Sequence, residues 1–209
     1  ANEGTIVWAR VIQGIRVNDV SLDNESDIVQ RLAATIAQPY GVIYARELDK
    51  SSDGIGDPRS RCVIEAFEYY RTHDPTRRAH VRACVERITT AYPTFAAGQV
   101  VLAFQGLLDY FHNSSDIGVL ETAMAAANRA IAFDPESARA HQVLMNVLHA
   151  RGDPTTALLI GKKAVSLNPC DMIILTSYGI RLLWSGETDQ AMTLLRRAAE
   201  YGPGQPQFV

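Results

Sequence analysis

A period of 34 residues runs through the carboxyl-terminal part of the chain and limits its fold more than any other feature. Gly152 and Gly186 are separated by this interval. So are three prolines and two sets of alanines: Pro135, Pro169 and Pro203; Ala123, Ala157 and Ala191; Ala130, Ala164 and Ala198. A fixed period of this length indicates that one supersecondary unit stacks on the next, and that neighbouring units bury a continuous core.

The composition is that of a core-forming chain without a dominant charge. Hydrophobic residues make up 47% of the 209 residues and charged residues 21%, and the formal net charge at pH 7 is -3. Proteins that coat nucleic acid or an anionic membrane need an excess of Lys and Arg. No stretch approaches the roughly 18 apolar residues of a membrane span. We therefore expect a protein or peptide partner, no direct nucleic-acid binding and no membrane binding.

Three cysteines, Cys62, Cys84 and Cys170, stand at wide spacings, so the sequence predicts neither a disulfide framework nor a zinc ribbon. A reducing compartment, the cytoplasm, is the default for such a chain. His80 and Cys84 lie four residues apart on a predicted helix and could hold a metal ion together with Cys62. Spacing places only two of these ligands, however, and cysteine is among the most buried residue types. Core packing is favoured, and no metal or cofactor is predicted.

The first 50 residues differ in character from the rest. Residues 5–12 (TIVWARVI) are rich in β-branched and aromatic types and predict one β-strand. Apolar residues at helical spacing predict helices over 24–37 and 40–48. No second convincing strand follows, so this strand either pairs with another copy of the chain, giving a homodimer, or belongs to a sheet upstream. Residues 51–59, rich in Ser, Asp, Gly and Pro, predict a linker.

From residue 60 onward the sequence predicts paired helices, the first of them over 60–72, 75–91 and 95–111. Asp74 is the predicted N-cap of the second helix, with Pro75 at its first position. Pro93 and Pro135 are 42 residues apart, so an eight-residue excess over the period, 112–119, follows the third helix. Three pairs of residues are predicted to lie between hairpins: Asp134-Pro135, Asn168-Pro169 and Gly202-Pro203. The expected repeats in the array 60–209 are 60–93, 94–135, 136–169 and 170–203.

The pattern resembles the tetratricopeptide repeat (TPR), a 34-residue unit of two antiparallel helices. The residues that carry the resemblance are Leu144, Met145, Leu148, Ala157, Gly161 and Ala164 in one unit, and Tyr178, Gly179, Leu182, Ala191, Leu195 and Ala198 in the next. The resemblance implies an all-α fold, a right-handed superhelical array of about four TPR-like helical hairpins. One β-strand and one or two helices precede this array.

A second resemblance covers the amino-terminal part. The stretch GTIVWAR from Gly4, a helix beginning near Asp27 and the run Pro39-Tyr40-Gly41 resemble the end of a TolB-like domain. That domain precedes repeats in some bacterial adenylate or guanylate cyclases and winged-helix transcription regulators. The likeness implies that the chain is the sensing or docking half of a larger signalling protein.

The first helices of stacked hairpins line the inner groove of such a solenoid, and solenoids use this extended concave surface for binding. A stripe at spacings of i, i+4 and i+7 on each first helix defines the predicted groove. Its residues are Val100, Phe104, Leu107, Gln142, Asn146, His149, Thr176, Ile180, Leu183 and the neighbouring Trp184. The alternative is that Phe104, Ile180 and Trp184 simply cover the core between repeats.

The sequence contains no H-E-x-x-H, G-x-S-x-G or P-loop motif. It therefore favours a non-enzymatic interaction and sensing module of a larger bacterial signalling or transcription-regulatory protein. Two alternatives stay open. One is a free-standing TPR adaptor or chaperone co-factor. The other is a helical hydrolase, which rests only on scattered His and carboxylate residues.

Overall fold

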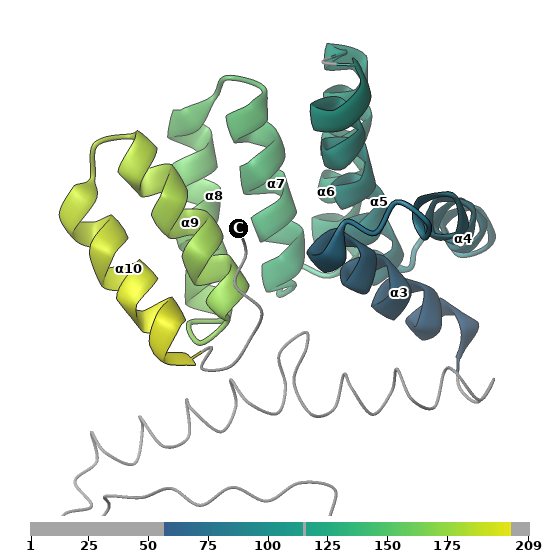
Figure 1. Ribbon diagram of the computed structural model, residues 1–209, viewed down its shortest axis with the longest axis horizontal. Coiled ribbons are helices and arrows are strands. Elements are labelled where there is room, and N and C mark those ends of the chain that lie inside the picture. The colour runs from purple at the N-terminus through teal and green to yellow at the C-terminus, as the bar shows by residue number, and fades with distance from the viewer. Residues whose placement is uncertain (1–56, 115, 202–209) are drawn as a thin grey trace, which may run out of the picture.

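The computed structural model describes residues 57–114 and 116–201, and this part of the chain is all-α (Figure 1). Its helices form four hairpins stacked in chain order, which confirms the predicted all-α array. A π-helical turn, η2 (Tyr110–Ser114), takes up part of the predicted excess. The α-helices of the described residues are α3 (Pro58–Thr72), α4 (Arg78–Ala91), α5 (Ala96–Asp109), α6 (Ile117–Phe133), α7 (Ala138–Ala150), α8 (Pro154–Leu167), α9 (Met172–Trp184) and α10 (Thr188–Tyr201).

Several predictions lie outside the described residues: the strand at 5–12, the helices at 24–37 and 40–48, the pair Gly202-Pro203 and most of the linker 51–59. The end of that linker is described, and it is helical from Pro58. Asp57 caps α3, its carboxylate accepting from the backbone N–H of Arg59 at 3.1 Å. Proline fits the first helical turn because its missing N–H would have no intrahelical partner there. Helix α3 therefore begins before the predicted start at Ser60.

Polar caps and glycines set the helix ends in the regular part of the array. Asp134-Pro135 and Asn168-Pro169 lie between hairpins, as predicted. Within the last two hairpins, Gly152 and Gly186 have φ of +87° and +85°. Glycine enters this left-handed region without a steric penalty and so lets the chain turn into the second helix. Asp153 then caps α8 by accepting a backbone N–H at 3.0 Å.

The predicted N-cap at Asp74 is wrong, because α4 begins only at Arg78. The Asp74 carboxylate instead accepts from the backbone N–H and the hydroxyl of Thr76, at 2.9 and 2.7 Å. These bonds fix a turn that precedes the helix. An Asp-Pro pair suits a turn as well as a helix start, and the local sequence does not separate the two.

Small residues at the repeat period form the inside of each hairpin. Six alanines there are at most 5% exposed: Ala123, Ala130, Ala157, Ala164, Ala191 and Ala198. Gly161 allows a still closer approach, since a Cβ at this position would lie 2.4 Å from the Tyr178 ring and 2.6 Å from the Met145 sulfur. Met145 belongs to α7 and Tyr178 to α9. Helix α8 thus packs tightly against both its partner and the next hairpin.

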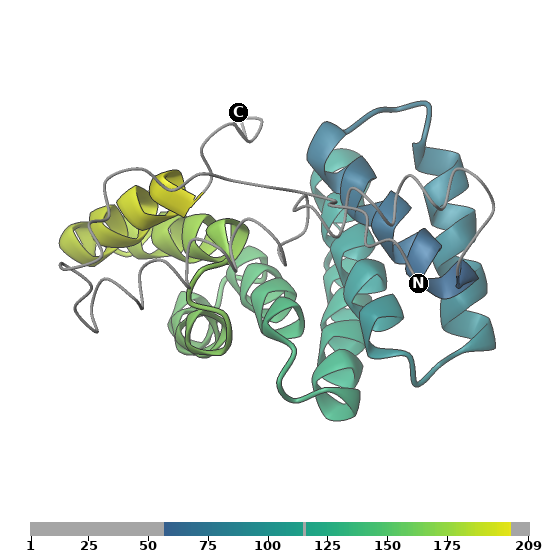
Figure 2. The ribbon, with the colours of Figure 1, turned by 90° about the horizontal axis from the view of Figure 1, so that it is seen from below.

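The first helices of the hairpins approach one another more closely than the second helices do. Helix α5 contacts both α3 and α7, and α7 contacts α9, whereas α8 touches α6 and α10 slightly at most. A stack with this difference curves toward its first helices, so α5, α7 and α9 lie along a concave face. Figure 2 shows the two later hairpins on one side of α5 and α6, with α3 and α4 on the other.

The first hairpin has a core of its own and a different direction. Its core comprises Cys62, Ala66, Tyr69, Val81, Cys84, Val85 and Ile88, with Val101 from α5. The two valines and the isoleucine of α4 occupy the places where alanines recur later in the chain. In Figure 1, α4 is seen nearly end-on while α7 and α8 are seen from the side. Larger residues inside the hairpin thus accompany a turn of this unit against the regular ones.

Replacing Gly161 with Ala is expected to destabilise the protein, because the added methyl group overpacks a filled site at a cost of about 1–3 kcal/mol. The higher helix propensity of Ala opposes this loss by about 1 kcal/mol, which leaves a net loss of about 1–2 kcal/mol. Chemical denaturation followed by circular dichroism measures it. The exposed neighbour Lys162→Ala is the control and should change stability by less than about 0.5 kcal/mol. A Gly161→Ala variant as stable as the parent would contradict the close packing.

Candidate functional site

Two rows of side chains meet between α7 and α9 on the concave face. At one end, the Gln142 amide donates to the Ser177 hydroxyl at 3.0 Å. Two turns further along both helices, the ring centroids of His149 and Trp184 lie 5.1 Å apart. One helical turn after Gln142 and after Ser177 come Asn146 and Arg181, so these two lie at the level between the observed contacts. The six residues form what we call the α7–α9 ladder: Gln142, Ser177, Asn146, Arg181, His149 and Trp184.

The middle level of the ladder holds two buried polar atoms without hydrogen-bond partners, Asn146 Oδ1 and Arg181 Nε. Asn146 is only 7% exposed. One terminal nitrogen of Arg181 donates to the Ser177 carbonyl at 3.2 Å, and the guanidinium carbon lies 5.4 Å from the Trp184 ring centroid. No carboxylate among residues 57–114 and 116–201 forms an ion pair with Arg181. This cation is therefore held in place without a counter-charge.

Burial shapes the electrostatics of the ladder. It lowers the pKa of the Arg181 guanidinium. The pKa of His149 is lowered too, first by burial and second by the positive charge of Arg181. The His149 imidazole is thus neutral at pH 7, and Arg181 carries the only full charge of the ladder. A buried charge is costly unless an opposite charge and hydrogen bonds compensate it.

Arg139 fixes the ladder in position by tying α7 to the start of α9. Its two terminal nitrogens donate to Asp171 at 2.5 Å and to the side-chain oxygen of Gln142 at 2.6 Å. Asp171 is 1% exposed and in turn caps α9, accepting two backbone N–H groups of its first turn at 2.9 and 3.1 Å. The guanidinium of Arg139 also lies 5.9 Å from the Phe67 ring centroid. Unlike Arg181, Arg139 already has a carboxylate partner.

The ten predicted groove residues differ widely in exposure. Val100 and Leu107 are 2% and 7% exposed and lie in the hydrophobic core, so they offer little surface to a ligand. Gln142 and Asn146 are also buried, whereas Leu183 and Trp184 are 42% and 64% exposed. The other four are half-buried: Phe104, His149, Thr176 and Ile180. The groove as a binding site stays a prediction.

Aromatic side chains fill the other end of the concave face. The Phe104 ring lies edge-on to Phe67 of α3, with centroids 6.1 Å apart, and 5.8 Å from Tyr70. The Tyr70 hydroxyl donates to the Val101 carbonyl at 2.6 Å. Phe104 therefore joins the first and second hairpins, which favours the alternative prediction of inter-repeat packing for this residue.

Ser177 and Arg181 were missed by the predicted stripe of α9. The stripe took Thr176 and Ile180, each one residue earlier in the chain. One signal was present in the sequence: Arg181 is the only charged residue within the otherwise uncharged helix MIILTSYGIRLLW. A lone cation in such a helix indicates a specific environment, since charged residues are seldom buried without a partner.

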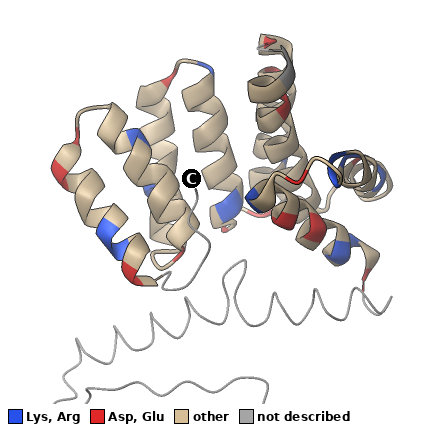
Figure 3. Ribbon diagram, viewed as in Figure 1, with Lys and Arg blue, Asp and Glu red and all other residues tan. Residues whose placement is uncertain are grey.

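Charge elsewhere on the array is mixed, with acidic and basic residues interspersed along the ribbon (Figure 3). Arg78 and Arg82 of α4 both bind Asp109 at the end of α5, at 3.0 and 2.5 Å. Arg151 of α7 binds Glu121 of α6 at 2.8 Å. These contacts are partly exposed and join neighbouring helices, and pairs of this kind contribute about 0–1 kcal/mol each.

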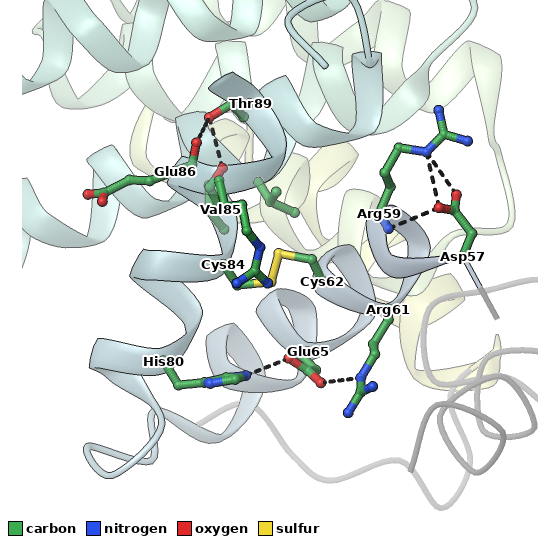
Figure 4. Close-up of a disulfide and its surroundings, with 12 residues drawn as sticks. Asp57, Arg59, Arg61, Cys62, Glu65, His80, Cys84, Val85, Glu86 and Thr89 are labelled. Carbon is green, nitrogen blue, oxygen red and sulfur yellow. Dashed lines mark hydrogen bonds and ion pairs between the residues drawn. A yellow bond between two sulfur atoms is a disulfide. The ribbon is translucent and has the colours of Figure 1, made fainter. Parts of the chain in front are cut away.

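The cysteines of the first hairpin are bonded to each other, which the sequence did not predict (Figure 4). The disulfide joins Cys62 of α3 to Cys84 of α4, and both residues are buried in the core of this hairpin, as expected for cysteine. His80 instead contacts Glu65 at 2.9 Å. The described residues contain no group of three or more side chains that could hold a metal ion. The candidate metal ligands therefore form a crosslink and an ion pair instead.

No protein-family model and no curated protein matches the chain. The crystal structure of TTC0263, a thermophilic TPR protein in Thermus thermophilus, superposes with a TM-score of 0.60 at 18% identity and covers 88% of each chain. The described part of this chain has the TPR fold. A Thermobaculum terrenum O-GlcNAc transferase mutant superposes with a TM-score of 0.54 at 20% identity, over 69% of this chain and 26% of that one.

At these identities the likeness establishes the TPR fold alone. The solved transferase chain is much longer than the segment matched, so its activity says nothing of the present TPR array. Of the helices that the structure describes, none combines the length and apolarity needed to cross a bilayer.

Reduction of the Cys62–Cys84 bond is expected to lower the free energy of unfolding by about 2–4 kcal/mol. The bond closes a 22-residue separation and restricts the unfolded chain. Thermal unfolding with and without a phosphine reductant measures the change. The double variant Cys62→Ala/Cys84→Ala is the control, because it lacks the bond and should not respond to reductant. An equal response of parent and control would contradict a stabilising crosslink.

His149 is expected to titrate below its ordinary pKa of 6.5 in an NMR titration. The unfolded chain then takes up a proton more readily than the folded one, so stability falls as pH drops through 6.5 toward the lowered value. Arg181→Gln removes the neighbouring positive charge and should raise the pKa of His149. The exposed Arg196→Gln is the matched control and should leave it unchanged. A His149 pKa at or above the ordinary value would contradict the buried environment.

Proposed function

We propose that this TPR array is a protein–protein interaction module that binds an extended peptide of a partner protein along its concave face. The observation that carries the proposal is the α7–α9 ladder. It combines buried polar atoms that lack partners with an aromatic side chain, Trp184, that is 64% exposed. Tryptophan and arginine are the residues most enriched among those that dominate binding energy at protein interfaces.

The exposed end of α9 supports a binding surface at this place. Leu183 and Trp184 are both exposed, and the half-buried Ile180 lies one turn earlier on the same helix. Together with the polar middle of the ladder, they offer apolar contact beside a few placed polar groups, which is the usual make-up of a ligand site. Thr176 and His149 extend the proposed surface, whereas Val100 and Leu107 support it from the core.

We propose that the module belongs to a larger bacterial signalling or transcription-regulatory protein and has no catalytic role of its own. The TolB-like resemblance of residues 4–41 supports this context, and the division into 1–50, 51–59 and 60–209 is part of the proposal. A free-standing TPR adaptor would use the same concave face. For location we keep the cytoplasm as a proposal, although the Cys62–Cys84 disulfide is typical of an oxidising compartment.

Replacing Trp184 with Ala is expected to weaken peptide binding at least tenfold without loss of stability, because the side chain is exposed in the free protein. A phage-displayed library of random dodecapeptides, selected on the full chain, supplies the ligands. Calorimetry with the selected synthetic peptides then measures their affinity. The matched control is Leu159→Ala on α8, whose side chain is 67% exposed but lies away from the ladder on a second helix.

Binding that survives in Leu159→Ala and is lost in Trp184→Ala would support the concave face. Equal affinities of both variants and the parent would place the peptide elsewhere on the molecule. Failure to select any peptide above background would count against the interaction module itself.

A further inference from the structure

We propose that Arg181 and Asn146 form the specificity site of this surface and bind the carboxylate of an Asp or Glu side chain within the partner peptide. The inference rests on the proposed function, because it names the chemistry that the concave face selects. Neither the repeat period nor the predicted groove stripe assigned a role to Arg181.

The first step is the number of donors left at the middle level of the ladder. A guanidinium has five N–H donors, and the structure gives Arg181 one hydrogen bond, to the Ser177 carbonyl. The Asn146 amide has an unbonded oxygen in the same level. Rotation of that amide by 180° exchanges its oxygen and nitrogen and presents N–H groups instead. Both side chains can then donate to one acceptor group between α7 and α9.

The second step is the sign of the missing partner. Arg181 is a partly buried cation without an acid partner in the described part of the chain, while the nearby Asp171 is taken by Arg139 at 2.5 Å. His149 is neutral and does not supply a charge. A bound water would satisfy donors but leave the charge uncompensated, whereas a carboxylate does both and can accept two parallel N–H bonds from arginine.

The third step is that the guanidinium is held before any ligand arrives. Trp184 lies against the Arg181 guanidinium and also contacts the His149 ring. Stacking on an aromatic ring fixes the plane of the donor fork, so less conformational entropy is lost when a carboxylate binds. A lysine at this position would keep the charge but lose both the plane and the paired donors.

The fourth step concerns the source of the carboxylate. The concave face continues beyond the middle level, to Leu183 and Trp184 on one side and toward Thr176 on the other. A peptide that passes through the site gains contacts on both sides, while a chain that ended there would gain them on one side only. This argument favours an acidic side chain inside the peptide over a terminal carboxylate.

The test is a double-mutant cycle between protein and peptide. Peptides from the library selection are made with amidated carboxyl ends, and each shared acidic residue is replaced by its amide, Glu by Gln or Asp by Asn. Binding is followed by the fluorescence of Trp184 in a Trp8→Phe background, since the chain has only two tryptophans. We expect the acid-to-amide change to weaken binding about tenfold in this parent and less than about twofold in Arg181→Gln.

Three further variants sharpen the result. Arg181→Lys should fall between the parent and Arg181→Gln. Asn146→Asp places a carboxylate beside Arg181 within the protein and should abolish the preference for acidic peptides, which tests the site even if Arg181→Gln folds poorly. Arg196→Gln on α10 removes an exposed arginine away from the ladder and should bind like the parent.

Each outcome bears on the inference separately from the proposed function. Peptides that bind in a Trp184-dependent manner but share no acidic position would overturn the carboxylate site and leave the concave face intact. An acid-to-amide loss of the same size in Arg181→Gln would do the same. Binding that requires a free carboxyl terminus would assign the site to a terminal carboxylate and overturn the side-chain source. Absence of any peptide binding would remove the proposed function together with this inference.

Discussion

Close approach between helices at positions with little or no side chain is the constraint on which the array depends. The alanines of the repeat period are almost fully buried, and Gly161 lies where any Cβ would overlap the Tyr178 ring. This packing places α8 against both α7 and α9. It thereby fixes the distance between α7 and α9, and the ladder on the concave face exists because that distance lets side chains of the two helices meet.

Two arginines on this face show how the same residue type serves structure or recognition. Arg139 is bound to the buried Asp171, which caps α9, and so it holds two hairpins in register. Breaking such a pair would leave an uncompensated charge, which costs about 3–5 kcal/mol. Arg181 has no such partner, and part of its guanidinium donor capacity is unused. The first is part of the frame, and the second is available for a ligand.

The first hairpin is held together differently from the regular repeats. It has Val81, Val85 and Ile88 in place of the small residues, and a separate core around the Cys62–Cys84 disulfide. The crosslink compensates for less regular packing by restricting the unfolded chain. Phe67 of this hairpin contacts both Phe104 and the Arg139 guanidinium, so the position of α3 also affects the middle of the concave face.

The sequence by itself determined the hairpins, because local rules place them: prolines and glycines end helices, and apolar residues at helical spacing define the buried stripe of each. Those rules also predicted the boundaries at Asp134-Pro135 and Gly152, but failed at Asp74, where a turn and a cap have the same local signal. Only the tertiary structure decided which residues meet across helices. Gln142 and Ser177 are 35 residues apart, and Cys62 and Cys84 are 22 apart. Their contacts, and the unpaired Arg181, depend on the register of packed helices, which no local pattern encodes.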